Sequence, residues 1–391
     1  MRRGHCSVTP AFVRALAQQA IAKALPWKGY GRLATAQKIL DVLVLAACLI
    51  SSLSAVVKRF AFGFSHETAR KAVDSNLPAD LQTLTEGLLD ALYLFGSRAL
   101  RRRKWVVAID EHRDPFYGDR STSGVTGGQK KHGSKYAFGY ATAVIVHLRH
   151  RFTVGLIALT GGEKPHEIVE ALLAQIQGRR LKIRGVVLDS GFDSGDVLLL
   201  LLQGRELSYA VPLRKKGDGK NKRNAVWELE AGTVTRVSWK TDKGDRPVST
   251  QAVVTQRPKE KEKEVYAFFG WGQREARRQR RRAALARRWY RKRFGIETSY
   301  RQMRQCKVKT TKKDVRYRLL LVGLALVLRQ AWVWLTRHLA RDFGLRPSQW
   351  VAILPLQRMG EWLADLLKSI YKEEKVIRLA SPLPPLTGFC V

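Results

Sequence analysis

Apolar side chains recur at helical spacing through residues 11–100, which predicts a largely helical region there. The first of its helices should stop before Pro26, because proline lacks the N–H that a helix ladder needs. Three apolar helices are expected, over residues 11–25, 35–57 (as one long helix or a pair) and 81–100.

A short polar helix is predicted between the second and third of these helices. Gly63 permits a tight turn, and Ser65 is placed to cap the helix that follows it. Arg70 would then lie on a helix similar to the recognition helix of a helix-turn-helix, whose polar residues enter the major groove of DNA. Short capped helices in small helical bundles have the same pattern, so both interpretations stay open.

From residue 105 onward, short β-branched runs replace the helical pattern. The first three strands should pair as an antiparallel meander, and the later strands alternate with helices. This order predicts an α/β fold in which helices pack on a mixed sheet. The expected strands cover residues 104–110, 136–148, 151–160, 183–189 and 209–213, and the expected helices cover 165–176 and 196–207. The basic, glycine-rich stretch 118–136 is predicted to be an exposed loop.

Short alternating strands after residue 214 indicate a β-rich insertion into this core. A very basic helix over 273–288 follows the insertion, and a mostly apolar helix covers 316–339. The chain thus divides into a helical N-terminal domain, two parts of one core, an insertion between them and a C-terminal tail. The helical N-terminal domain covers 1–103, and the core covers 104–213 and 270–340. The insertion covers 214–269, and the tail covers 341–391.

One continuous helix is predicted from Trp289 to Arg304. At about 100° per residue, a polar stripe runs beside an apolar one on this helix, so one carboxylate lies among arginines at the edge of the buried face. An isolated stripe of this kind is typical of a salt-bridged surface helix. The mid-helix Gly295 costs roughly 1 kcal/mol and has no explanation in the pattern. The polar stripe contains Tyr290, Arg293, Glu297, Arg301 and Arg304.

The charge balance of the chain points to a polyanionic partner. Its 391 residues include 71 Lys and Arg against 33 Asp and Glu, a net charge of +38. Nucleic acid is the expected partner, and a membrane surface or a ribosome-like assembly is the alternative. The apolar runs 42–57 and 319–328 fall short of the ~20 residues that span a bilayer, so no membrane partner is expected. Four scattered cysteines and the absence of a signal-peptide pattern suggest reduced thiols in the cytoplasm.

Three acids from separate segments have the chemistry of a phosphodiester-cleaving site. Asp110 and Asp189 each end a predicted strand, and Glu297 lies on the helix described above. Carboxylates of this kind hold two Mg²⁺ ions, ~3.5–4 Å apart, that activate the attacking oxygen and stabilise the leaving oxygen. A strand-end carboxylate taken alone more often caps the next element. Asp193 and Asp196 compete as the second acid, but only Asp189 directly ends the strand.

Four motifs carry a resemblance to a known family, from about Trp105 to Leu335. The chain resembles the DDE transposases of IS4-like insertion sequences, and most closely their ISH3-like group. The broader IS4 pattern has Lys seven residues after the Glu, whereas Arg304 stands there in this chain. The matching segments are Val107–Gly118, Lys135–Thr142, Val187–Phe192 and Tyr290-x2-Arg293-x3-Glu297-x3-Arg301.

The resemblance implies an RNase H-like core with Asp110, Asp189 and Glu297 as catalytic metal ligands. The implied cofactor is Mg²⁺, for which Mn²⁺ would substitute, as two ions. The reaction would be hydrolysis at the transposon ends, followed by attack of the freed 3′-hydroxyl on target DNA. Double-stranded DNA, a homodimer on that DNA and a cytoplasmic, nucleoid-associated location are expected. Expected DNA contacts come from Tyr290, Arg293, Arg301, Arg304, Lys130, Lys131 and Arg70.

Two other functions compete with this interpretation. The first is a catalytically inactive or repurposed DNA-binding protein, which the complete acid triad argues against. The second is a tyrosine recombinase, because His338 and Arg341 followed by Tyr371 loosely match its motif. That set lies outside the strand-based core.

Overall fold

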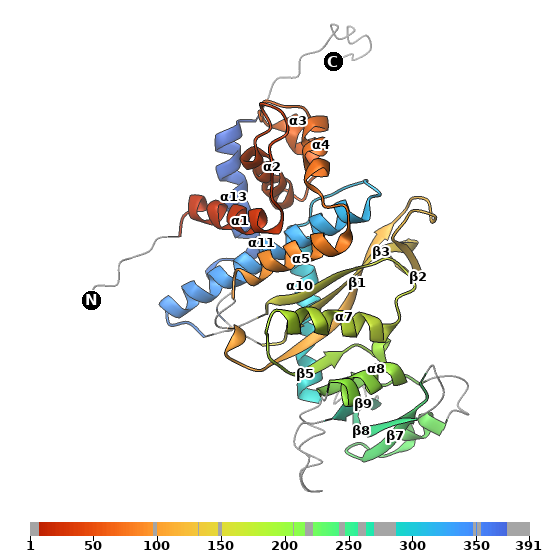
Figure 1. Ribbon diagram of the computed structural model, residues 1–391. Coiled ribbons are helices and arrows are strands. Elements are labelled where there is room, and N and C mark those ends of the chain that lie inside the picture. Colours follow the sequence, from red (N-terminus) through yellow and green to blue (C-terminus); the bar gives the residue numbers. More distant parts are fainter. Residues whose placement is uncertain are drawn as a thin grey trace, which may run out of the picture.

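Figure 1 shows a helical region at one end of the molecule, a large sheet in the middle and a strand-rich part at the other end. It is a computed structural model. The structure describes residues 8–96, 100–131, 133–147, 151–205, 207–215, 222–241, 247–256, 263–269, 287–346, 349 and 353–373. Two sequence predictions lie outside these ranges: most of the basic helix expected over 273–288, and the Pro-rich end of the chain.

Capped helices form the N-terminal region, as the periodicity predicts. The expected pair over 35–57 is two helices with a bend of 106° between them. The Ser65 side chain accepts a hydrogen bond from the Thr68 amide at 3.1 Å, and Gly63 has a φ of +81° in the turn before it. The helices are α1 (Pro10–Ala24), α2 (Ala36–Cys48), α3 (Leu53–Arg59), α4 (His66–Asn76) and α5 (Leu81–Tyr93).

The C-terminal tail expected from sequence contains a long helix that packs into this helical region. Helix α13 (Leu356–Tyr371) lies against α1 and α2 (Figure 1). The Tyr371 hydroxyl donates to Asp41 Oδ2 at 2.6 Å, and Arg14 of α1 donates to the same fully buried carboxylate. Short helices were expected from Leu345 onward, and α13 is longer than that expectation, at 16 residues. The contact that orders α13 comes from residues more than 300 positions earlier in the chain.

Replacing Asp41 by Ala should lower the free energy of unfolding by about 2 kcal/mol. The change leaves a buried tyrosine hydroxyl and a half-buried guanidinium without their acceptor, and Arg14 recovers part of the loss by turning to water. Chemical denaturation of the variant measures the effect. Glu361→Ala, which removes an exposed ion pair on α13, should change the value by less than about 0.5 kcal/mol. Equal losses in the two variants would contradict a structural role for the buried network.

A single mixed sheet forms the centre of the described structure. Its strand order is β2-β3-β1-β5-β6-β9-β8-β7, with β4 paired to β3. Strands β1, β3 and β4 are the predicted antiparallel meander, and β1, β5 and β6 are parallel. The strands are β1 (Trp105–Phe116), β2 (Val125–Lys131), β3 (Ser134–Ile145), β4 (Thr153–Leu159), β5 (Ile183–Leu188), β6 (Ser208–Pro212), β7 (Val234–Trp239), β8 (Val248–Gln256) and β9 (Lys263–Phe269).

One expectation about the strands was wrong. The stretch 118–136 is no simple loop, because it contains β2 and the start of β3, and β1 continues to Phe116. Ten residues of β1 pair with β3, from Val107 with Ile145 to Phe116 with Tyr136. This partner supplies backbone hydrogen bonds to residues whose own propensity is poor. The strands predicted for the β-rich insertion are present as β7, β8 and β9, and they continue the core sheet because β9 pairs with β6.

Helices cover both faces of the sheet. On one face lie α5, α7 (Pro165–Gly178) and α11 (Val315–Asp342), packed on alternate residues such as Val107 and Ile109. Helix α11 is long and apolar enough to cross a membrane, but 89% of its most apolar window is buried inside the protein, so it is a core helix. On the other face lies α10 (Phe294–Arg304), packed on Val106 and Ala108. Asp110 follows them at the same alternation, so it belongs to the α10 face.

The helix predicted from Trp289 to Arg304 is interrupted. A helical segment covers 287–292, Arg293 forms a turn, and α10 begins at Phe294. The Arg293 amide bonds to the Tyr290 carbonyl and the Ile296 amide to the Arg293 carbonyl, both three residues back. This tighter turn separates the two parts of the expected stripe. Gly295 is therefore the second residue of a helix, where its propensity cost is smaller than in mid-helix.

Candidate catalytic site

The three predicted acids meet where β5 ends beside the middle of β1. Strands β1 and β5 are parallel and pair Ile109 with Leu188, so Asp110 and Asp189 occupy the next position on each strand. The Tyr300 hydroxyl of α10 bonds to the Asp110 carbonyl oxygen at 2.8 Å and shares a second bond of 2.8 Å with Thr142. These contacts fix α10 over the strand ends. They place Glu297, one turn earlier on α10, beside the two aspartates.

The guanidinium of Arg293 lies between the three carboxylates. Its Nη2 is 2.8 Å from Glu297 Oε1 and 3.8 Å from Asp189 Oδ1, and its Nη1 is 3.5 Å from Asp110 Oδ2. The Arg293 side chain is only 8% exposed. Sequence reasoning assigned Arg293 to DNA rather than to an ion pair. In the structure it is the cation that holds the acid cluster together, and it reaches no open surface.

The acid cluster is short of positive charge even with Arg293 in place. Burial raises the pKa of Asp110 to about 7, Arg293 opposes that rise, and the nearby Asp189 and Glu297 add to it. A buried carboxylate that resists ionisation beside two other acids gains from an added cation. The electrostatics of the site therefore favour a divalent metal ion.

The residues fit such an ion in donor type. Carboxylate oxygens are the ligands that Mg²⁺ and Mn²⁺ prefer. Among the described residues no three acidic, histidine or cysteine side chains already stand at metal-binding spacing. The guanidinium of Arg293 lies where the carboxylate oxygens converge. Metal binding at this site thus requires Arg293 to withdraw.

Asp110 should make the metal-free protein less stable as the pH rises. Its folded pKa of about 7 lies above the unfolded value of ~3.9. The folded state therefore retains the proton while the unfolded state releases it, and stability falls between about pH 4 and pH 7. Asp110→Asn should remove this slope and, at pH 8 in a chelator, be more stable than the parent by at least ~1 kcal/mol. Thermal unfolding across this pH range measures it, and an unchanged slope would contradict the burial of Asp110.

The remaining predicted residues do not share this cluster. Tyr290 packs on Tyr266 of β9, with ring centroids 4.9 Å apart. Arg301 and Arg304 are exposed on the outer side of α10, and Lys130 is exposed on β2. The side chain of Lys131 lies outside what the structure describes. Arg70 is exposed on α4 in the helical region, next to Glu67 on the same helix.

Sequence reasoning gave Tyr300 no role in positioning the acids. It placed Tyr300 on the apolar stripe of the predicted helix, yet the Tyr300 hydroxyl holds α10 to β1. The His112 ring stacks on the Tyr300 ring at 4.8 Å between centroids. The competing acid Asp193 has a structural role, because it accepts hydrogen bonds from the Trp239 indole at 2.8 Å and the Arg214 amide at 3.1 Å. Only the pairing of distant strands reveals these contacts.

The recombinase motif does not form a site. Tyr371 is 8% exposed and bonds to Asp41 inside the helical region. The His338 ring nitrogen Nδ1 contacts the Trp334 carbonyl oxygen one turn earlier on α11. A nucleophilic tyrosine must reach a phosphate, and this hydroxyl is enclosed by three helices.

Comparison with known proteins agrees with this geometry. The family model of the transposase DDE domain matches residues 101–328, which is more than half of the chain and includes all three acids. A cryo-electron microscopy structure of a piggyBac transposase synaptic complex with hairpin DNA is similar in fold, with a TM-score of 0.57 and 13% sequence identity. The similarity covers 95% of this chain and 82% of that one, and it confirms the RNase H-like fold with its helical N-terminal region. No curated protein sequence gives a significant match. The chain belongs to the transposase DDE domain family and is a DNA transposase, an enzyme that cleaves and transfers DNA strands.

Proposed function

We propose that this transposase cuts the ends of an insertion sequence with Asp110, Asp189 and Glu297 and joins the freed 3′-hydroxyl to target DNA. The observation that carries the proposal is the convergence of these acids from β1, β5 and α10 on one guanidinium. Transposases with DDE domains depend on divalent metal ions. Two Mg²⁺ ions held by the three acids, with Mn²⁺ as a substitute, would activate the attacking oxygen and stabilise the leaving one.

The protein's own groups prepare this site in three ways. The pairing of β1 with β5 holds Asp110 and Asp189 side by side, and Tyr300 fixes the helix that brings Glu297. Arg293 neutralises the acids before the metal binds. When it withdraws, its fork of N–H donors suits a phosphate oxygen of the bound DNA. Tyr290 lies beside Arg293 and is proposed to contact the same transposon end.

The finer classification also remains a proposal. The Arg301 and Arg304 pair favours an ISH3-like member of the IS4-like transposases. Both arginines are exposed at the outer side of α10, which supports contact with double-stranded DNA, as does the exposure of Lys130 and Arg70. We propose Lys131 as a further DNA contact on its position in the chain alone. A homodimer is proposed because two transposon ends must be brought together, and the location proposed is the cytoplasm, at the nucleoid.

The proposed division into domains follows the one expected from sequence, except at the C-terminal helix. We propose a helical N-terminal domain over 1–103, a catalytic core over 104–213 and 270–340, and a β-rich insertion over 214–269. The docking of α13 on α1 and α2 supports adding residues 356–371 to the helical domain rather than to a separate tail.

Cleavage of DNA that carries the ends of the element tests the function. In excess Mg²⁺ the protein should nick the DNA at the ends of the element. A chelator should abolish this cleavage. Tyr371→Phe should cleave as the parent does, because its hydroxyl is enclosed. Cleavage that persists in the chelator and is lost in Tyr371→Phe would overturn the metal mechanism in favour of a tyrosine recombinase.

A further inference from the structure

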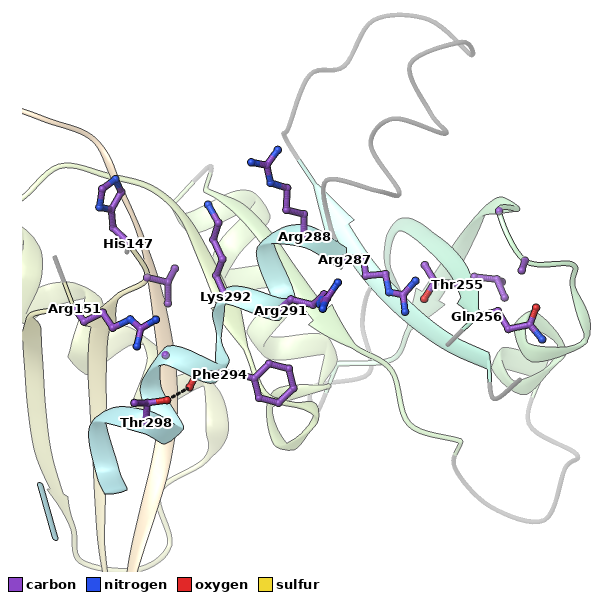
Figure 2. Close-up of a pocket in the computed structure, with 15 residues that line it drawn as sticks. His147, Arg151, Thr255, Gln256, Arg287, Arg288, Arg291, Lys292, Phe294 and Thr298 are labelled. Atoms are coloured by element: carbon purple, nitrogen blue, oxygen red, sulfur yellow. Dashed lines mark hydrogen bonds between the residues drawn. The ribbon is translucent and has the colours of Figure 1, made fainter. Parts of the chain in front are cut away.

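We propose that a cleft on the reverse side of α10 binds an unpaired strand of DNA, an inference that rests on the proposed transposition reaction. The cleft has a volume of about 750 Å³. It lies between the catalytic helix, the end of β8 and the residues that join β3 to β4 (Figure 2). Glu297 faces the acids on one side of α10, whereas Gly295 and Thr298 face this cleft on the other. No residue of the acid cluster lines it.

The lining of the cleft is strongly cationic. Of the described residues that line it, none is acidic, and five are arginine or lysine. Figure 2 shows these side chains coming from the helical segment before α10 and from the β3–β4 connection. The five are Arg151, Arg287, Arg288, Arg291 and Lys292.

These cations lie close to one another at the cleft, and Lys292 also lies over the Trp289 ring, with its Nζ 3.9 Å from the ring centroid. Burial lowers the pKa of Lys292, and repulsion from Arg288 and Arg184 lowers it further. Burial also lowers the pKa of Arg151, with no acid opposing the fall. By contrast, Arg179 elsewhere in the protein pairs with Glu86 at 2.6 Å. Like charges gathered at a partly buried cleft are costly unless an anion binds there, and phosphate groups are the anions that a transposase meets.

An exposed aromatic ring in the same cleft adds a second kind of contact. Phe294, the first residue of α10, is 51% exposed although it is apolar. The Tyr290 ring lies next to the Phe294 ring, with 6.4 Å between the two centroids. The Phe294 ring lines the same cleft as the basic side chains (Figure 2). Basic residues interleaved with an exposed aromatic ring are typical of sites where bases stack and the backbone phosphates are neutralised.

The size of the cleft favours unpaired nucleotides over a duplex. Its volume falls in the range of pockets that enclose small molecules, ~300–1,000 Å³, and a nucleotide or two would fill it. Gly295 lines the cleft, and an added Cβ would stand at ordinary contact distance, 3.6 Å, from Arg151 Nε. The Thr298 hydroxyl donates to the Phe294 carbonyl at 3.0 Å and so stays on the helix.

Binding measurements on the full chain, in a chelator so that no cleavage occurs, test the cleft. The probes are a labelled single strand, its abasic counterpart and the matching duplex, followed by fluorescence anisotropy. Phe294→Ala should weaken binding of the single strand about tenfold, within the ~1–3 kcal/mol that stacking contributes, and leave the abasic strand and the duplex unchanged. Lys292→Gln should weaken the single strand and the abasic strand alike, and reduce the salt slope by about 1.

Controls separate this result from misfolding. Phe294→Leu keeps the apolar bulk and should still lose the preference for bases. Phe343→Ala removes another exposed ring, at the end of α11, and should bind as the parent does. The proposal would be overturned if Phe294→Ala weakened binding of the single strand and the duplex equally, or weakened neither. It would also be overturned if Phe343→Ala weakened binding as much as Phe294→Ala. If the Phe294 effect appears while Glu297→Gln still cleaves, the proposed catalytic triad fails and the cleft stands.

Discussion

Glu297→Gln is expected to lower the rate of DNA end cleavage by on the order of 10³-fold, or ~4 kcal/mol of transition-state stabilisation. The amide keeps the size of the side chain but removes the charge that would bind a metal ion. Glu297 is 45% exposed and contacts Arg293, so its loss should cost little stability. Single-turnover cleavage under saturating DNA measures the rate, and anisotropy in a chelator should show unchanged DNA binding.

Glu170→Gln provides the matched control for this loss. Glu170 is an exposed acid on α7, on the opposite face of the sheet, and its replacement should leave the rate within about twofold. End cleavage that survives in Glu297→Gln with binding intact would rule out the triad. The chain would then be a DNA-binding protein in which the three acids do not catalyse cleavage.

Arg293→Gln should have the second largest effect, and its sign depends on the metal. In a chelator the variant should lose about 2 kcal/mol of stability, because three carboxylates remain near one another without their cation. Saturating Mg²⁺ or Ca²⁺ should stabilise the variant more than the parent, because the guanidinium no longer competes for the same oxygens. Thermal unfolding with and without the ion measures both effects. Cleavage should still fall by about 10²-fold, since the phosphate contact is lost.

Arg293→Lys separates charge from geometry. An ammonium restores the cation but not the planar fork that reaches three carboxylates, so stability in a chelator should recover and cleavage should not. If divalent ions stabilise the parent and Arg293→Gln equally, Arg293 and the metal do not compete. The position of the guanidinium between the acids would then describe only the metal-free protein.

Local pattern was sufficient to predict most elements and the acids. The apolar runs before Asp110 and Asp189 predict strands, and helical spacing with a Ser65 cap is readable within one turn, because these signals depend on neighbours in sequence. The parallel arrangement of the predicted strands also brings their carboxyl ends together. The site was therefore predictable as three acids at one edge of a sheet.

The tertiary structure decided what those acids touch and what lies behind them. Arg293 sits among the carboxylates because α10 begins one residue later, at a turn that the helical periodicity across 289–304 concealed. The second half of β1, the continuation of the sheet through β9 and the docking of α13 on Asp41 all depend on partners far along the chain. The cleft behind α10 has the same origin, since β8 and the β3–β4 connection meet the helix only in the fold. Sequence alone determined which side chains carry the chemistry, because spacing is local. Only the folded chain decided their partners, because burial and charge pairing are set by non-local contacts.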